Sequence, residues 1–361
     1  MDTTKKIFNK SSLLVPLVSI VLGLIIGAIA MLAGGYNPIV AYTSLFERLF
    51  GSPYHMGEAI RAITPLIFTG IAVAFAFRTG LFNIGVEGQF VMGMTGATLI
   101  GVLLDLPWYI HGPLAIVTGA LFGGLWAGIV GFLKATRGVN EVISSIMLNW
   151  TALYLANYIV AAFLLEPGQQ KSRPIHASAL MHIDWLIELM DRARMHWGTL
   201  IALLGVAVFY LLLWRTKQGY ELRAVGHNPD AALYAGMNVN RTIVKSMMIS
   251  GVFAGLGGVF EVLGVFGNQT IMAASPGYGF DGIAVALLGG NTPVGVLLAS
   301  ILFGGLSYGS SGMSFGAGVP SEIVRIVIGS VIFFVAAHGI VKYMLKPFMQ
   351  KRSADKRKEA A

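Results

Sequence analysis

The sequence predicts an all-α fold: a polytopic transmembrane helical bundle of about ten spans, one of them a broken or half-helix. The first observation is composition, since the 361-residue chain is 55% hydrophobic and only 12% charged. Soluble domains carry about 25% charged residues. The second is that the apolar residues gather in long runs, and about 20 such residues are the length of a membrane-spanning helix. The third is that basic residues lie mainly in the loops between these runs.

The apolar runs give the order of the predicted helices. They are 12–33, 59–77, 83–104, 113–133, 141–165, 197–214, 243–266, 280–290, 293–309 and 321–341. The run 280–290 is too short to cross a bilayer alone. We therefore expect a half-helix there, or a re-entrant pair with 293–309, interrupted at Leu-Leu-Gly-Gly-Asn-Thr-Pro (287–293).

The first run follows Lys5, Lys6 and Lys10, a combination that also occurs in signal peptides. Its length of about 20 residues exceeds the usual apolar region of a signal peptide, roughly 7–15 residues. We interpret it as a retained first span.

The net charge of +8 predicts orientation and not nucleic-acid binding, because the basic residues form no single patch. Most of them fall on the side of the N-terminus, which by the positive-inside rule puts both termini in the cytoplasm. The predicted organisation is a basic N-terminus (1–11), a transmembrane domain (12–343) and a basic tail (344–361). There is no cysteine, which excludes disulfides and thiolate metal sites.

The stretch 78–96 is polar where hydropathy predicts membrane, with Asn83, Glu87 and Gln89 among five glycines. A carboxylate at membrane depth costs roughly 3 kcal/mol on insertion scales unless it is paired or wetted. Asn83 and Glu87 are four residues apart and share one helix face. Two interpretations remain: polar groups that pin helices together, or a stretch that borders a solute path.

The predicted external loop, 166–196, contains an amphipathic segment at 179–192. Its apolar residues recur at helical spacing, which predicts a helix on the membrane surface or a platform for an extracellular partner. His176, His182 and His196 are too scattered to indicate a metal site.

The predicted cytoplasmic loop, 215–241, contains a short capped helix. Asn228 is a good N-cap and Pro229 a good first residue, and Gly236 is a typical stop. Such a rigid projection between two spans indicates a docking element for a soluble protein.

Three blocks of sequence resemble one family. Phe82–Gln89 (Phe-Asn-Ile-Gly-Val-Glu-Gly-Gln) is similar to a signature of permease subunits in bacterial ABC importers for branched-chain amino acids, ribose-type sugars and nucleosides. Residues 222–236 resemble the coupling-helix segment of that group, and 277–290 a third family block. The first block is most similar to the nucleoside, guanosine-type, branch.

The resemblance implies a permease subunit in the cell membrane that imports nucleosides. The implied partners are a separate ABC ATPase, a second permease chain and an extracellular solute-binding protein, with no nucleic acid and no cofactor. Asn83, Glu87 and Gln89 would border the path. The residues implied in ATPase coupling are Arg223, Gly226, Asn228, Asp230, Ala231, Ala232 and Gly236.

Other readings stay open at this stage. A sister branch would carry simple sugars or branched-chain amino acids. A self-sufficient secondary transporter could use Glu87, Glu261, Asp281 or Glu322, although it would need no docking element. No P-loop sequence occurs, so we expect no catalytic residues and ATP hydrolysis by another chain.

Overall fold

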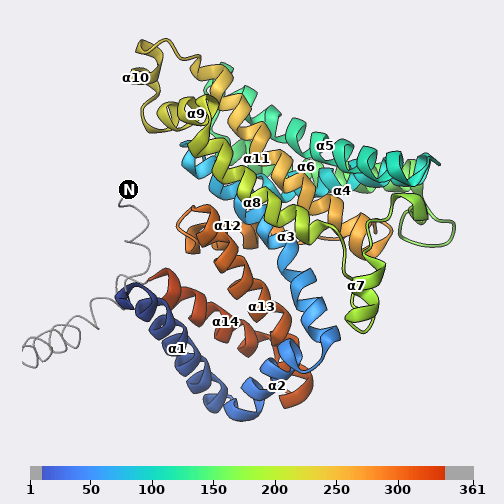
Figure 1. Cartoon of the computed structure of the whole chain (residues 1–361), viewed down its shortest axis with the longest axis vertical. Coiled ribbons are helices and arrows are strands. Elements are labelled where there is room, and N and C mark those ends of the chain that lie inside the picture. The colour runs from blue at the N-terminus through green and yellow to red at the C-terminus, as the bar shows by residue number, and fades with distance from the viewer. Residues whose placement is uncertain (1–9, 338–361) are drawn as a thin grey trace, which may run out of the picture. The chain divides into compact units, whose positions relative to one another are not determined.

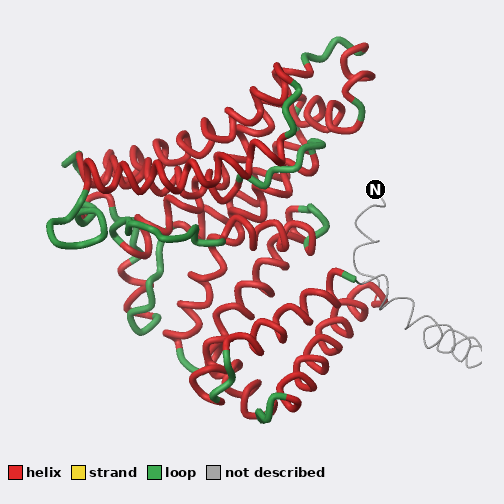
Figure 2. Tube along the Cα trace, turned by 180° about the vertical axis from the view of Figure 1, so that it is seen from behind, coloured by secondary structure: helices red, strands yellow, loops and turns green. Residues whose placement is uncertain are grey.

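The computed structural model describes residues 10–337, and all of its regular elements are helices (Figures 1 and 2). The basic N-terminus before Lys10 and the basic tail lie outside the described residues. The chain divides into two compact units. The larger unit is Phe50–Gly305, and the smaller one contains the described parts of Met1–Leu49 and Leu306–Ala361.

The all-helical fold is confirmed for the described residues, and within them each predicted apolar run coincides with a helix; residues 338–341 of the last run lie outside them. Within residues 10–337, seven helices are long and apolar enough to cross a membrane: Pro53–Arg78, Val86–Leu103, Trp108–Arg137, Glu141–Leu164, Gly198–Arg215, Val239–Phe266 and Pro293–Ala317. Leu17–Ala33 and Tyr278–Leu288 are shorter apolar helices. The number of crossings and the side on which the termini lie therefore remain predictions.

The core of the larger unit is formed by α3 (Pro53–Arg78), α4 (Val86–Leu103) and α11 (Val239–Glu261). In their most apolar windows 72%, 83% and 72% of the residues are buried. The buried share is smaller for three other helices, α5 (Trp108–Arg137), α6 (Glu141–Ile159) and α8 (Gly198–Arg215). It is 33% for α5, 28% for α6 taken together with η1 (Val160–Leu164), and 33% for α8. The second group keeps one apolar side for lipid, as a helix at the edge of a membrane bundle requires.

Close packing in this core depends on small residues where α4, α5 and α11 meet. A Cβ at Gly123 of α5 would clash with the backbone of Gly251 and Gly255 on α11. A Cβ at Gly93 of α4 would clash with Gly255 as well. The spacing Gly251/Gly255 thus gives the close helix contact that such pairs permit in lipid.

The loop 166–196 contains less helix than its sequence predicts. Within the amphipathic segment 179–192 only α7 (Asp184–Leu189) is α-helical; residues 180–183, after a 3-10 turn, η2 (Ala177–Ala179), are not helical, and 190–192 form a turn. The reason is tertiary hydrogen bonding: the Met181 N–H donates to the Leu263 carbonyl, and the Ile183 N–H to the Met195 carbonyl (3.0 and 3.1 Å). These bonds replace the local helical ones.

The predicted break after the short helix is confirmed. Helix α12 (Tyr278–Leu288) ends at Gly289, and α13 (Pro293–Ala317) begins after a tight turn. Arg78, the last residue of α3, fixes that turn. Its Nε donates to the Asn291 carbonyl (2.7 Å) and its Nη2 to the Gly290 carbonyl (3.0 Å).

The smaller unit consists of α1 (Lys10–Ala33), α2 (Pro38–Phe50), the end of α13 and α14 (Ser321–Ala336). Helix α1 packs on α14, where a Cβ at Gly23 would clash with the Val331 backbone. The Tyr42 hydroxyl donates to the Leu24 carbonyl at 2.6 Å and joins α2 to α1. Helix α2 was not predicted from the sequence.

Candidate functional site

The polar stretch at the start of α4 is a closed hydrogen-bond network. Asn83 and Gln89 pair through their amides: each Nδ2 or Nε2 donates to the other's carbonyl oxygen, at 2.9 and 3.0 Å. Asn83 also donates to the Ser250 hydroxyl of α11 (2.8 Å), which in turn donates to the Ala72 carbonyl of α3 (2.7 Å). The amide pair therefore ties α4 to both other core helices.

A second amide supports the same stretch from α6. Asn149 accepts the Gly88 N–H at 2.8 Å and donates to the Ile84 carbonyl at 3.0 Å. Both groups belong to the first turn of α4 or its approach, where backbone N–H groups have no helical partner. Asn149 thus fixes the position at which α4 begins.

Glu87 connects α4 to the short helix α12. Its two carboxylate oxygens accept the Gly277 N–H (2.6 Å) and the Gly279 N–H (2.5 Å). These donors lie at the N-terminus of α12, where a carboxylate also balances the positive end of the helix dipole. A Cβ at Gly279 would clash with Glu87, so only glycine allows this approach.

The three predicted path residues are brought together by this arrangement. Asn83 and Glu87 have no exposed surface and Gln89 is 1% exposed. Their hydrogen bonds are to protein groups on α4 and the residues before it, on α11 and at the start of α12. The stretch can therefore hold the orientation of α12, an apolar helix of only 11 residues.

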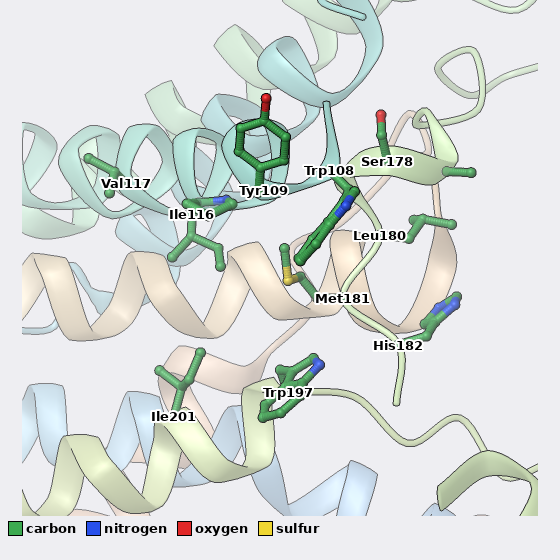
Figure 3. A pocket seen from close by; sticks show the side chains of 12 residues that line it. Trp108, Tyr109, Ile116, Val117, Ser178, Leu180, Met181, His182, Trp197 and Ile201 are labelled. Atoms are coloured by element: carbon green, nitrogen blue, oxygen red, sulfur yellow. The ribbon is translucent and has the colours of Figure 1, made fainter. Parts of the chain in front are cut away.

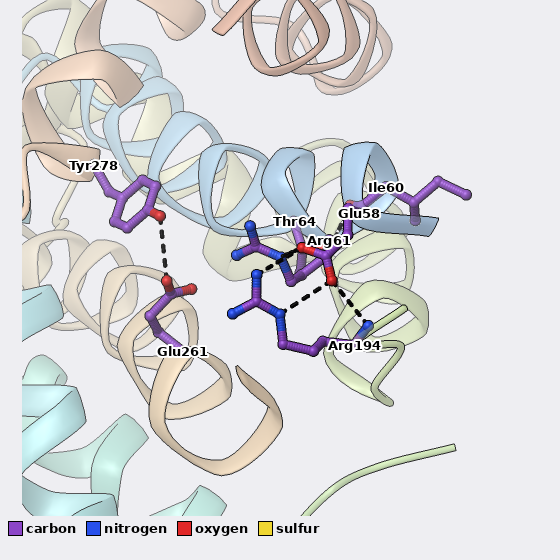
Figure 4. A network of polar contacts seen from close by, with 7 residues as sticks. All are labelled: Glu58, Ile60, Arg61, Thr64, Arg194, Glu261 and Tyr278. Atoms are coloured by element: carbon purple, nitrogen blue, oxygen red, sulfur yellow. Dashed lines mark hydrogen bonds and ion pairs between the residues drawn. The ribbon is translucent and has the colours of Figure 1, made fainter. Parts of the chain in front are cut away.

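A buried ion cluster at the other end of α3 was not predicted (Figure 4). Glu58 is 2% exposed and accepts from Arg61 at 2.8 Å and from Arg194 at 2.7 and 3.0 Å. These hydrogen bonds raise the pKa of Arg194. Nearby, Glu261 of α11 accepts from the Tyr278 hydroxyl at 3.2 Å.

An apolar cavity of about 570 Å³ lies beside this end of the unit (Figure 3). It is formed by the first turns of α5 and α8 and by the loop 166–196. Trp108, Tyr109 and Trp197 stand at the starts of these spans, the depth at which aromatic residues gather in membranes. The predicted path residues do not line it.

The predicted docking element forms two helices, α9 (Lys217–His227) and α10 (Pro229–Tyr234). The Asn228 side chain accepts the Ala231 N–H at 3.0 Å, so the predicted N-cap is confirmed. Gly236 ends the turn with φ +81°. Ala232 is 4% exposed, whereas Leu233 and Tyr234 are 62% and 96% exposed and form the tip.

The two helices lie at the end of the larger unit opposite to α7 (Figure 1). Gly226 attaches α9 to the end of α3: a Cβ there would clash with Thr79 and Gly80, and a Cβ on Gly80 would clash with Gly226. The Thr79 hydroxyl bonds to the Ser246 hydroxyl of α11. Asp230 and Gly236 line a separate, open cavity of about 540 Å³.

These features define a class: a multi-pass helical membrane protein with a short helix locked inside the bundle and a capped helical projection at one end. Residues 55–336 match the family model described as "Branched-chain amino acid transport system / permease component". The chain belongs to this family of ABC transporter permeases, and it is an integral membrane protein.

Among its relatives is the guanosine ABC transporter permease NupP of Bacillus subtilis (strain 168), 49% identical over 94% of this chain and 98% of NupP. The nucleoside ABC transporter permease NupB of Lactococcus lactis is 38% identical over 98% of this chain and 97% of NupB. The glucose ABC transporter permease TsgB13 of Haloferax volcanii is 33% identical over 91% of this chain and 88% of TsgB13.

Proposed function

We propose that this chain is a permease subunit of an ATP-driven nucleoside importer. The observation that carries the proposal is the 49% identity to a guanosine permease over nearly the full length of both chains. The structure supports it with a membrane-spanning unit and a capped projection suited to a soluble ATPase.

The proposed path runs beside the α4–α12 contact. The path is bordered by Asn83, Glu87 and Gln89. Glu87 holds α12 directly, Asn83 and Gln89 fix the start of α4, and the solute passes along the surface that α12 presents. Their full burial supports a positioning role, because a side chain with its hydrogen bonds satisfied by the protein has little capacity for a ligand. A movement of α12 would then open or close the route.

The proposed coupling element is the segment from Arg223 to Gly236, which docks a separate ABC ATPase. Leu233 and Tyr234 provide its exposed contact surface. Gly226 transmits its movement to α3 because the two backbones are in direct contact. The remaining proposed partners are a second permease chain, since two subunits enclose the route in this architecture, and an extracellular solute-binding protein.

The deciding experiment is uptake of labelled guanosine by cells with and without this chain. We expect uptake to be lost on deletion, and we expect excess ribose or leucine not to compete. Purified chain reconstituted without partners should show no accumulation. Accumulation by the chain alone would support a secondary transporter instead.

A sugar is the second candidate solute, because the family includes a glucose permease 33% identical to this chain. The same uptake assay separates the two. Intact guanosine uptake in the deletion strain together with lost sugar uptake would assign this chain to the sugar branch.

A further inference from the structure

A basic cavity of about 400 Å³ lies at the base of the coupling element. It is formed by the end of α3, the last turn of α8 and the C-terminal half of α9. Its lining residues are Phe77, Arg78, Gly80, Trp214, Arg223, Gly226 and His227. Among these described lining residues there is no carboxylate, so the cavity presents positive charge to whatever enters it.

Trp214 organises the two arginines of this cavity. The Arg78 and Arg223 guanidinium carbons lie 5.9 and 6.0 Å from the centre of the indole ring, within the range of cation–π contacts. Arg78 is further fixed by the Gly290 and Asn291 carbonyls. In the described contacts Arg223 donates only its Nε, to the Gly219 carbonyl at 3.3 Å. Its terminal amino groups are therefore available to a ligand.

The position of the cavity at the ends of two spans indicates which kind of anion it would bind. Trp214 lies in the last turn of the 18-residue span α8, and Arg78 is the last residue of the span α3. Arg215, next to Trp214, lies 5.9 Å over the Tyr210 ring. Tryptophan, tyrosine and arginine at the end of a span mark the membrane–water boundary. At that boundary the abundant anion is the phosphodiester of a lipid headgroup.

We propose that this cavity binds the headgroup of an anionic phospholipid. The phosphodiester accepts hydrogen bonds from Arg223 and Arg78, and the acyl chains lie along the exposed apolar side of α8. The ATPase is the less suitable source of the anion, because the exposed tip that faces a soluble partner is on α10 and not at this boundary. Since the headgroup touches both α3 and α9, it would strengthen the contact between Gly80 and Gly226.

The test uses the purified full-length chain in a neutral detergent. Thermal unfolding is followed while short-chain phosphatidylglycerol, short-chain phosphatidylcholine or inorganic phosphate is added. We expect a saturable rise in Tm with phosphatidylglycerol, on the order of a few degrees, because the ligand binds the folded state. Phosphatidylcholine should give less than half of this rise, and millimolar phosphate none.

The matched variants are Arg223→Gln in the cavity and Arg241→Gln on α11, outside its lining. Arg223→Gln should raise the phosphatidylglycerol concentration that gives half of the maximal Tm rise at least tenfold. Arg241→Gln should leave this concentration at its wild-type value. Should Arg223→Gln fail to fold, His227→Gln serves as the second cavity variant. Equal shifts with both lipids, an unchanged midpoint in both cavity variants, or a matching shift with phosphate alone would each overturn the proposal.

Discussion

Gly80 and Gly226 are in contact backbone to backbone, and each occupies the space that a Cβ of the other would need. Gly80 lies two residues after the end of α3 and three residues before Asn83, and Gly226 lies in the last turn of α9. This contact is a direct physical connection between the projecting segment and the end of α3. Its consequence is that the coupling element has a rigid base and an exposed tip.

Substitution of Gly226 by alanine tests that route. Alanine favours the helix, but its Cβ would push α9 away from Thr79 and Gly80. We expect guanosine uptake to fall at least tenfold while the variant still inserts and still copurifies with its ATPase. The matched control is Gln218→Ala, at an exposed position on the same helix. Equal uptake by both variants would contradict the route.

Substitution of Gly236 by valine tests the docking segment. Gly236 has φ +81° and no atom within reach of an added Cβ, so valine would strain the backbone without a clash. We expect uncoupled transport with normal membrane insertion, and partial rescue by Gly236→Asn, since asparagine tolerates this conformation. Cysteines at Asp230 or Ala232 should crosslink to the copurified ATPase. Consistent absence of crosslinks at both positions would refute the docking proposal.

Glu87 is tested with two substitutions that differ in what they leave unbonded. Glu87→Gln keeps the shape but can accept only one of the two N–H groups from α12, a loss of roughly 1–3 kcal/mol. Glu87→Leu leaves both N–H groups without an acceptor. We expect folded Glu87→Gln protein with reduced uptake. If both variants fold and transport normally, the path proposal is wrong; if both only unfold, Glu87 has a purely structural role.

The ion cluster predicts a large loss of stability for Glu58→Gln. Glu58 is the shared acceptor of Arg61 and Arg194, and breaking a buried pair by removing one partner costs about 3–5 kcal/mol. The lower end is expected, since the Arg194 side chain is 44% exposed. Thermal unfolding in detergent measures the effect. The control, Glu188→Gln, changes an exposed carboxylate on α7 and should be neutral.

His196 predicts a pH dependence of stability. Burial is the main cause that lowers its pKa to about 4 in the folded chain, with a further contribution from the Arg61 charge. The unfolded chain binds the proton first, so stability is fully present above pH 6.5 and decreases as the pH falls towards 4. The total is about 3 kcal/mol. His196→Asn, whose side chain can still accept the Gly198 N–H, should flatten the decline between pH 6.5 and 4.5. An unchanged slope would contradict the assignment.

The helices of this fold were predictable because each long apolar run has one physical solution in a membrane. Helix α2 was missed, since its 13 residues are too few for a span and include Glu47 and Arg48. The segment 179–192 was assigned as one helix from its periodicity. Its hydrogen bonds to Leu263 and Met195 are tertiary and cannot be read from a local pattern.

The candidate site was predictable only where the signal is local. The Asn228 cap and the Gly236 stop are encoded within a few residues, and both occur as expected. The polar character of Asn83, Glu87 and Gln89 was visible, but their partners were not. Ser250 and Gly277 reach them from other helices. The cluster of Glu58 with Arg194 joins residues separated by 136 positions, and its assembly depends on the rotation of α3 about its axis.

The exposed tip of α10 has a consequence for how the complex is made in the cell. Leu233 and Tyr234 present 62% and 96% of their surface to solvent in the isolated chain. A chain synthesised in excess of its ATPase would display this apolar tip to proteases and chaperones, while an assembled chain would hide it. The residues that are proposed to contact the ATPase would thus also mark an unassembled chain for degradation.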